Sequence, residues 1–99
     1  MKRFEYSQGK NEQLKKRHGI SFENVIEALR KGKLLDTLDH PNKIQYPNQQ
    51  IFIIELNEYV YSVPFVENEV KIFLKTIYPS RKHTKKYLKG GRHEDIKNK

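Results

Sequence analysis

The segment from Ser80 to Leu88 carries residue types that act in phosphate chemistry. Arg and Lys stabilise negative charge, and a guanidinium fork suits a phosphate group, while His and Tyr can transfer protons. His83 and Tyr87 are one helical turn apart, so both side chains can face the same way. Together with Arg81 and Lys82, they supply the residue types needed to cleave RNA through its own 2′-hydroxyl, a reaction that requires no metal.

Each of these residues could also have a role that is not catalytic. Arg81, at the end of the last predicted strand, can be an ordinary surface arginine. His83 and Tyr87 can belong to a solvated basic helix whose role is to bind a partner protein. Lys75 lies in a predicted strand of mostly apolar residues, so it points either into a functional cleft or into solvent. The catalytic candidates are therefore Arg81, Lys75, His83 and Tyr87, with both interpretations open.

Basic residues are concentrated at the C-terminal end of the chain. The formal net charge is +8, and residues 80–99 contain eight Lys and Arg against two acidic residues, a contribution of +6 (8 − 2). Such a cluster attracts polyanions by counterion release. We therefore expect RNA as a partner, with Lys82, Lys85 and Lys86 as binding residues. A solvated tail that only aids solubility is the alternative.

The end of the first predicted helix offers two further candidate RNA contacts, Arg17 and His18. A histidine at a helix end also interacts with the terminal carbonyl groups and the helix dipole, which is the structural alternative for His18. The four histidines of the chain show no paired spacing of metal ligands. We therefore expect neither a metal nor another cofactor.

Two N-terminal helices are predicted to support the strands that position these residues. Residues 8–18 are helix-forming with little apolar content, and Gly19 suits the left-handed position after a helix. Ser21 is a good N-cap for a second helix, which Gly32 ends. Four of its apolar residues fall at i, i+3, i+4 and i+7 and so share one face: Phe22, Val25, Ile26 and Leu29.

The remaining sequence is typical of strands joined by tight turns. Strands are predicted at Phe4–Ser7, Lys33–Leu38, Gln50–Leu56, Tyr59–Val66 and Lys71–Tyr78. Pro64 indicates an edge strand or a bulge at its position. The fold class predicted is α+β, with two N-terminal helices packed on a four- to five-stranded antiparallel sheet and a short basic C-terminal helix. The expected core draws on Phe22, Val25, Ile26, Leu29, Ile51, Ile53, Val63 and Ile72.

Length and composition indicate one small domain. The 99 residues suffice for one modest core, and the absence of cysteine excludes disulfides and thiolate metal sites. The start of the chain is polar, and no stretch approaches the roughly 20 apolar residues that span a bilayer. We expect a cytoplasmic protein with no membrane partner, built of one domain at residues 1–89 and a flexible basic tail at residues 90–99.

Two stretches of the sequence resemble the BrnT toxin family. The first runs from Phe4-Glu5-Tyr6 through Lys10-Asn11 and Leu14 to Arg17-His18-Gly19-Ile20-Ser21-Phe22-Glu23, and the second is Ser80-Arg81-Lys82-His83-Thr84-Lys85-Lys86-Tyr87. They lie in the order and spacing of that family and span roughly residues 4–88. The chain departs from the family pattern in its last two strands, where Pro64-Phe65 and Lys75 stand near the usual His or Thr and Arg.

The resemblance implies a RelE-like fold and an RNA-cleaving toxin of a type II toxin–antitoxin system. It also implies a tight complex with a BrnA-like antitoxin, which silences the toxin and represses the shared operon. The toxin would meet operator DNA only through that complex. A noncatalytic nucleic-acid-binding or regulatory module would account for the same basic end, as would an inert partner whose basic helix holds an acidic protein. Substitutions that keep RNA affinity but abolish cleavage would distinguish an enzyme from these alternatives.

Overall fold

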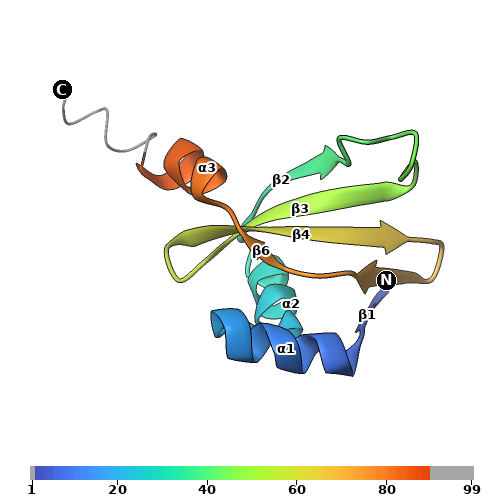
Figure 1. The fold of residues 1–99 in the computed structure, drawn as a ribbon, viewed down its shortest axis with the longest axis horizontal. Helices are drawn as coiled ribbons and strands as arrows, with labels where there is room; N and C mark the ends of the chain where they lie inside the picture. The colour runs from blue at the N-terminus through green and yellow to red at the C-terminus, as the bar shows by residue number, and fades with distance from the viewer. Residues whose placement is uncertain (1, 90–99) are drawn as a thin grey trace.

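The computed structural model describes residues 2–89, which form an α+β fold with a six-stranded mixed sheet. α1 and α2 lie together on one side of the strands, and α3 lies at the opposite end (Figure 1). The elements follow the order β1 (Arg3–Tyr6), α1 (Gln8–His18), α2 (Phe22–Arg30), β2 (Leu34–Asp39), β3 (Gln49–Leu56), β4 (Tyr59–Glu67), β5 (Lys71–Leu74), β6 (Tyr78–Pro79), α3 (Arg81–Thr84) and the π-helical turn η1 (Lys85–Lys89).

Both N-terminal helices have the predicted signals at their ends. α1 spans the predicted residues and ends at Gly19, whose φ of 68° lies in the left-handed region that favours glycine. At the start of α2, the side chain of Ser21 accepts a hydrogen bond from the backbone N–H of Asn24. The Asn24 side chain accepts one from the N–H of Ser21 in return, which makes a reciprocal capping box. The prediction of two helices is confirmed.

A polar cluster built around the buried Asn11 joins the two helices to each other and to β1. The Asn11 side chain is fully buried, and its Oδ1 accepts a hydrogen bond of 2.7 Å from the backbone N–H of Phe22. Its Nδ2 donates to Glu23 Oε1 at 3.1 Å, and Tyr6 Oη donates to Glu23 Oε2 at 3.0 Å. Asn11 thus satisfies an N–H at the start of α2 that has no partner within the helix.

The sheet has the strand order β1-β5-β4-β3-β2, with β6 also paired to β4. The prediction of a four- to five-stranded antiparallel sheet is wrong in two respects. β1 pairs parallel to β5, and the predicted strand at residues 71–78 is divided into β5 and β6. A parallel pair is possible because two helices and three strands separate β1 from β5, so no hairpin forces the two strands to be antiparallel.

Pro64 lies in a central strand, opposite the break between β5 and β6. Ser62 and Phe65 are three residues apart, whereas their partners Tyr78 and Leu74 are four apart, so the second strand contains one extra residue. The backbone oxygen of Pro64 accepts a hydrogen bond from Lys75 N at 2.8 Å. The bulge predicted from this proline is confirmed, and the alternative of an edge strand is wrong.

The main cluster of the core lies between the two helices and one face of the sheet. Of the eight predicted core residues, Phe22, Val25, Ile53 and Val63 are buried. The other four are only half-buried: Ile26, Leu29, Ile51 and Ile72. Side chains on a strand alternate between faces, so Phe52 and Ile54 point to the helices and Ile53 to the opposite face. Phe52 stacks on Phe65 with ring centroids 3.8 Å apart.

The expectations about a C-terminal tail and about a membrane span both concern residues that the structure describes only in part. The predicted basic tail at residues 90–99 is outside them, so the division into a domain and a tail stays a prediction. Within residues 2–89, no helix is long and apolar enough to cross a membrane.

Candidate functional site

A pair of residues fixes the start of the C-terminal helix to β4. Ser80 caps α3 by accepting a hydrogen bond from the N–H of His83 at 3.2 Å, and its own N–H donates to the carbonyl of Val60 at 2.9 Å. Thr84 is buried, and its hydroxyl accepts from the N–H of Val60 at 2.9 Å and donates to the carbonyl of Ser80 at 2.7 Å. These bonds set where the following side chains lie relative to the sheet.

The turn η1 extends this segment to β2. Tyr87 Oη donates a hydrogen bond to Asp36 Oδ2 at 3.2 Å. Asp36 pairs with Ile53 in the sheet and therefore lies on the face turned away from α1 and α2. The candidate residues of α3 and η1 thus meet the sheet on the side that the N-terminal helices leave open.

His83 is half-buried beside Ser80 and Tyr87. Its Nδ1 lies 2.8 Å from Ser80 Oγ, and its ring stacks on that of Tyr87 with centroids 6.2 Å apart. Burial lowers the pKa of His83; the positive charges of Lys82 and Lys86 lower it further, and Asp36 opposes them. His83 is therefore neutral at pH 7 and can accept a proton.

Tyr87 is a protonated group that can donate a proton, whereas His83 can accept one. Burial raises the pKa of its phenol, and the hydrogen bond and charge of Asp36 raise it further, so the hydroxyl keeps its proton at neutral pH. The Nζ of Lys86 lies 5.3 Å from the centre of the Tyr87 ring. A proton acceptor, a proton donor and nearby cations are therefore brought together, the ingredients that the sequence indicated for this segment.

Asp36 is the member of this cluster that sequence analysis missed. It lies 51 positions before Tyr87, and no motif relates the two. Its strand is short and mostly exposed, so the residue reads as a surface acid in the sequence. Only the pairing of β2 with β3 places it next to the C-terminal segment.

Arg81 and Lys75, the two other catalytic candidates, are exposed. Neither side chain makes a hydrogen bond or ion pair within residues 2–89. Arg81 is the first residue of α3, two positions before His83, and Lys75 lies at the bulge opposite Pro64. Lys82, Lys85 and Lys86 are exposed around the same helical segment, as a binding surface for an anion requires.

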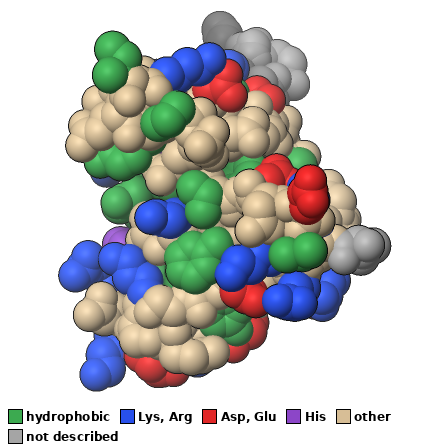
Figure 2. All heavy atoms as spheres, turned by 90° about the vertical axis from the view of Figure 1, so that its right-hand side faces the viewer, with side chains coloured by type: hydrophobic (Ala, Val, Ile, Leu, Met, Phe, Trp, Pro, Cys, Tyr) green, Lys and Arg blue, Asp and Glu red, His purple; other side chains and the backbone are tan. Residues whose placement is uncertain are grey.

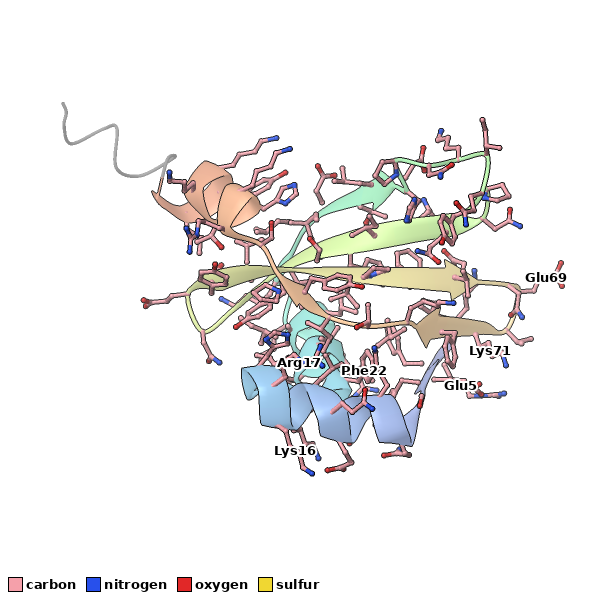
Figure 3. All side chains as sticks on the ribbon, viewed as in Figure 1. Glu5, Lys16, Arg17, Phe22, Glu69 and Lys71 are labelled. Carbon is pink, nitrogen blue, oxygen red and sulfur yellow. The ribbon has the colours of Figure 1, made fainter. Side chains whose placement is uncertain are left out.

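The structure does not bring Arg17 and His18 to this cluster. Both belong to the last turn of α1, on the helical side of the sheet. Figure 3 shows Arg17 beside α1 and α2, well separated from α3, and Lys16 pointing away from the sheet. An RNA that contacts both regions would have to pass around the end of the sheet.

The described part of the chain contains no group of three or more His, Asp or Glu side chains placed to hold a metal ion. Comparison with protein-family models, with curated proteins and with solved structures finds no match to this chain.

Proposed function

We propose that this protein is the toxin of a type II toxin–antitoxin system and acts as an endoribonuclease of RelE-like fold. The observation that carries the proposal is the cluster of His83, Tyr87 and Asp36, with the positive charges of Lys82 and Lys86 close to it. It combines a neutral imidazole, a protonated phenol and positive charge on the side of the sheet opposite α1 and α2. Acid–base cleavage of RNA needs these three functions.

In the proposed reaction, neutral His83 accepts the proton of a ribose 2′-hydroxyl, and the 2′-oxygen attacks the adjacent phosphorus. The bond to the 5′-oxygen breaks, and Tyr87 protonates that leaving oxygen. The products are a 2′,3′-cyclic phosphate and a free 5′-hydroxyl. Arg81 and the neighbouring lysines stabilise the charge that develops on the phosphoryl oxygens.

The resemblance to the BrnT family extends the proposal to partners. A BrnA-like antitoxin would bind this protein and silence it, and operator DNA would be contacted only by the complex. Support for the fold assignment comes from the arrangement of two helices on one face of the sheet and a basic helix at the other end of the molecule. The neighbouring reading frame offers a direct check, since a small DNA-binding protein would be encoded there.

Single-turnover cleavage of RNA at saturating enzyme tests the catalytic assignment. Arg81→Ala should lower the rate by about a hundredfold or more without lowering the melting temperature, because an exposed arginine contributes little to stability. Arg81→Lys keeps the positive charge but removes the guanidinium fork, so it separates the effect of charge from that of geometry. Tyr87→Phe removes the hydroxyl and so tests the proposed proton donor. Lys16→Ala, which removes one positive charge at an exposed position that points away from the sheet, is the matched control and should cleave normally. An Arg81→Ala variant with the wild-type rate would leave Arg81 as a binding residue at most.

A noncatalytic nucleic-acid-binding module is the second candidate function. It is favoured by the exposure of Arg81, Lys82, Lys85 and Lys86 on one short segment, an arrangement that is sufficient for phosphate contacts. The absence of cleavage products from wild-type protein under saturating conditions, together with RNA affinity that falls steeply with salt, would support it over the enzyme.

A further inference from the structure

A groove lies between β1 and α2, on the helical side of the sheet. Its apolar walls are formed by Phe4 and Tyr6 of β1, Ile72 of β5, and Ile26 and Leu29 of α2. The groove has a volume of about 780 Å³. That volume is within the range of sites that hold a ligand, so the groove is large enough to receive side chains of another molecule.

The groove collects most of the apolar side chains that the core leaves partly exposed. Seven hydrophobic residues are partly buried against the core, and five of them line this groove. α2 therefore has two apolar surfaces: Phe22, Val25 and Ala28 are buried in the core, whereas Ile26 and Leu29 border the groove. A contiguous apolar surface of this kind on a small protein marks a binding site more often than scattered exposed residues do.

Cations surround this apolar surface. Lys2, Arg3 and Arg30 also line the groove, and no acidic residue does. Arg3 is paired with Glu5 at 3.0 Å and Lys2 with Glu67, whereas the side chain of Arg30 has no acidic partner within the described residues. Figure 2 shows hydrophobic side chains exposed between Lys and Arg side chains in the lower half of this view. The charge favours an acidic occupant, and it disfavours a second copy of a chain whose net charge is +8.

The groove runs beside an open strand. β1 is the last strand on its side of the sheet and pairs only with β5 within residues 2–89. Such an edge presents backbone N–H and C=O groups that can pair with an added strand. Phe4 and Tyr6 point to the helical side, so a strand added to β1 would direct alternate side chains into the groove.

We propose that this groove binds an extended, acidic segment of a partner protein. The segment adds to the edge of β1, places apolar side chains at alternate positions against Ile26 and Leu29, and brings carboxylates to Arg30. The proposal is independent of the ribonuclease, because the groove lies on the side of the sheet opposite to Asp36 and is tested by binding alone.

The test uses the full chain and a fluorescent synthetic peptide of alternating valine and glutamate. The matched probes are a peptide of the same composition with all valines in one block, and a peptide of alternating valine and lysine. We expect the alternating acidic peptide to bind at least about tenfold more tightly than either control peptide, a difference in binding free energy of roughly 1.4 kcal/mol. In ¹⁵N NMR spectra, its binding should shift the amide signals of residues 3–6 and 26–30.

Two charge reversals then locate the contact. Arg30→Glu should weaken the peptide roughly tenfold, the scale expected when a paired charge becomes repulsive. Lys16→Glu changes the net charge equally at a position that points away from the sheet, and it should have little effect. Leu29→Ala should also weaken binding, with a thermal melt to verify folding; if it unfolds the chain, the Arg30 and Lys16 pair decides.

Three results would overturn the proposal. The first is equal weakening by Arg30→Glu and Lys16→Glu, which would show binding by net charge alone. The second is a set of shifted amide signals confined to residues 81–88, which would place the peptide on the basic end. The third is the absence of binding, or concentration-dependent dimerisation that occupies the same residues.

Discussion

Several residues that carry the resemblance to the BrnT family have structural roles in this protein. Asn11 and Glu23 connect α1, α2 and β1 through hydrogen bonds, and Thr84 fixes α3 to β4. Gly19 supplies a backbone conformation that other residues rarely adopt. These positions bear on the fold, whereas the proposed chemistry depends on His83, Tyr87 and their surroundings.

Asn11→Ala should destabilise the domain substantially. The substitution leaves the N–H of Phe22 buried without its acceptor and removes one donor from Glu23, a loss of about 1–3 kcal/mol. Urea denaturation measures the change, and Gln13→Ala at an exposed position of the same helix is the matched control, with an expected change within about 0.5 kcal/mol. Equal stability of the two variants would contradict the structural role of Asn11.

The pH dependence of cleavage should report His83. Because burial lowers its pKa below the ordinary value, the neutral base persists as pH falls through about 6.5 and is lost only below that. The value of kcat/KM should therefore decline on the acid side at a pH below about 6.5, and His83→Gln should remove both that limb and most of the rate. An unchanged acid limb in His83→Gln would assign the base to another group.

The lowered pKa of His83 also makes the stability of the folded protein depend on pH. The unfolded chain binds a proton on His83 at a higher pH than the folded protein does, so the stability linked to this group is present above about 6.5. It decreases as pH falls from there to the lowered pKa of the folded state.

At the scale of elements, the C-terminal segment depends on two anchors. Ser80 and Thr84 hold α3 to β4 through the backbone of Val60, and Tyr87 holds η1 to β2 through Asp36. The first anchor is buried and the second is exposed. We therefore expect the start of the segment to be the more firmly held part.

Thr84→Val should detach this segment while conserving the volume of the side chain. The N–H of Val60 would lose its acceptor, and such an unsatisfied buried donor costs about 1–3 kcal/mol. Hydrogen exchange at the Val60 amide should accelerate, and cleavage should slow because His83 and Tyr87 lose their position. Thr37→Val, on the exposed part of β2, is the matched control. Unchanged exchange at Val60 in Thr84→Val would show that Ser80 alone fixes the helix.

Sequence periodicity and end signals predicted the elements better than their assembly. Ser21, Gly19 and Gly32 define helix ends through local interactions, which a sequence displays directly. The parallel pairing of β1 with β5 depends on contacts between residues nearly 70 positions apart, such as Phe4 with Ile72, and no local pattern encodes it. Asp36 was missed for the same reason, since its role arises from strand pairing.

On the scale of the whole molecule, two surfaces of different character lie on opposite sides of the sheet. The basic C-terminal segment is exposed on one side, and the apolar groove beside β1, with its basic rim, is on the other. A ligand of one surface would not block the other directly. Binding of RNA and of an acidic segment should therefore be distinguishable by substitutions on the two sides.

The salt dependence of RNA affinity tests how much of this basic surface is used. Each phosphate contact releases counterions, so the logarithm of the affinity for single-stranded RNA should fall linearly with the logarithm of the salt concentration. Lys82→Ala and Lys86→Ala should each reduce the steepness of that slope by about 0.7 and weaken all RNA sequences alike. Lys16→Ala removes the same charge from the outer surface of α1 and should leave the slope nearly unchanged. Fluorescence anisotropy over a range of salt concentrations measures all three, and equal changes in slope would mean that RNA is attracted by net charge and not by the C-terminal segment.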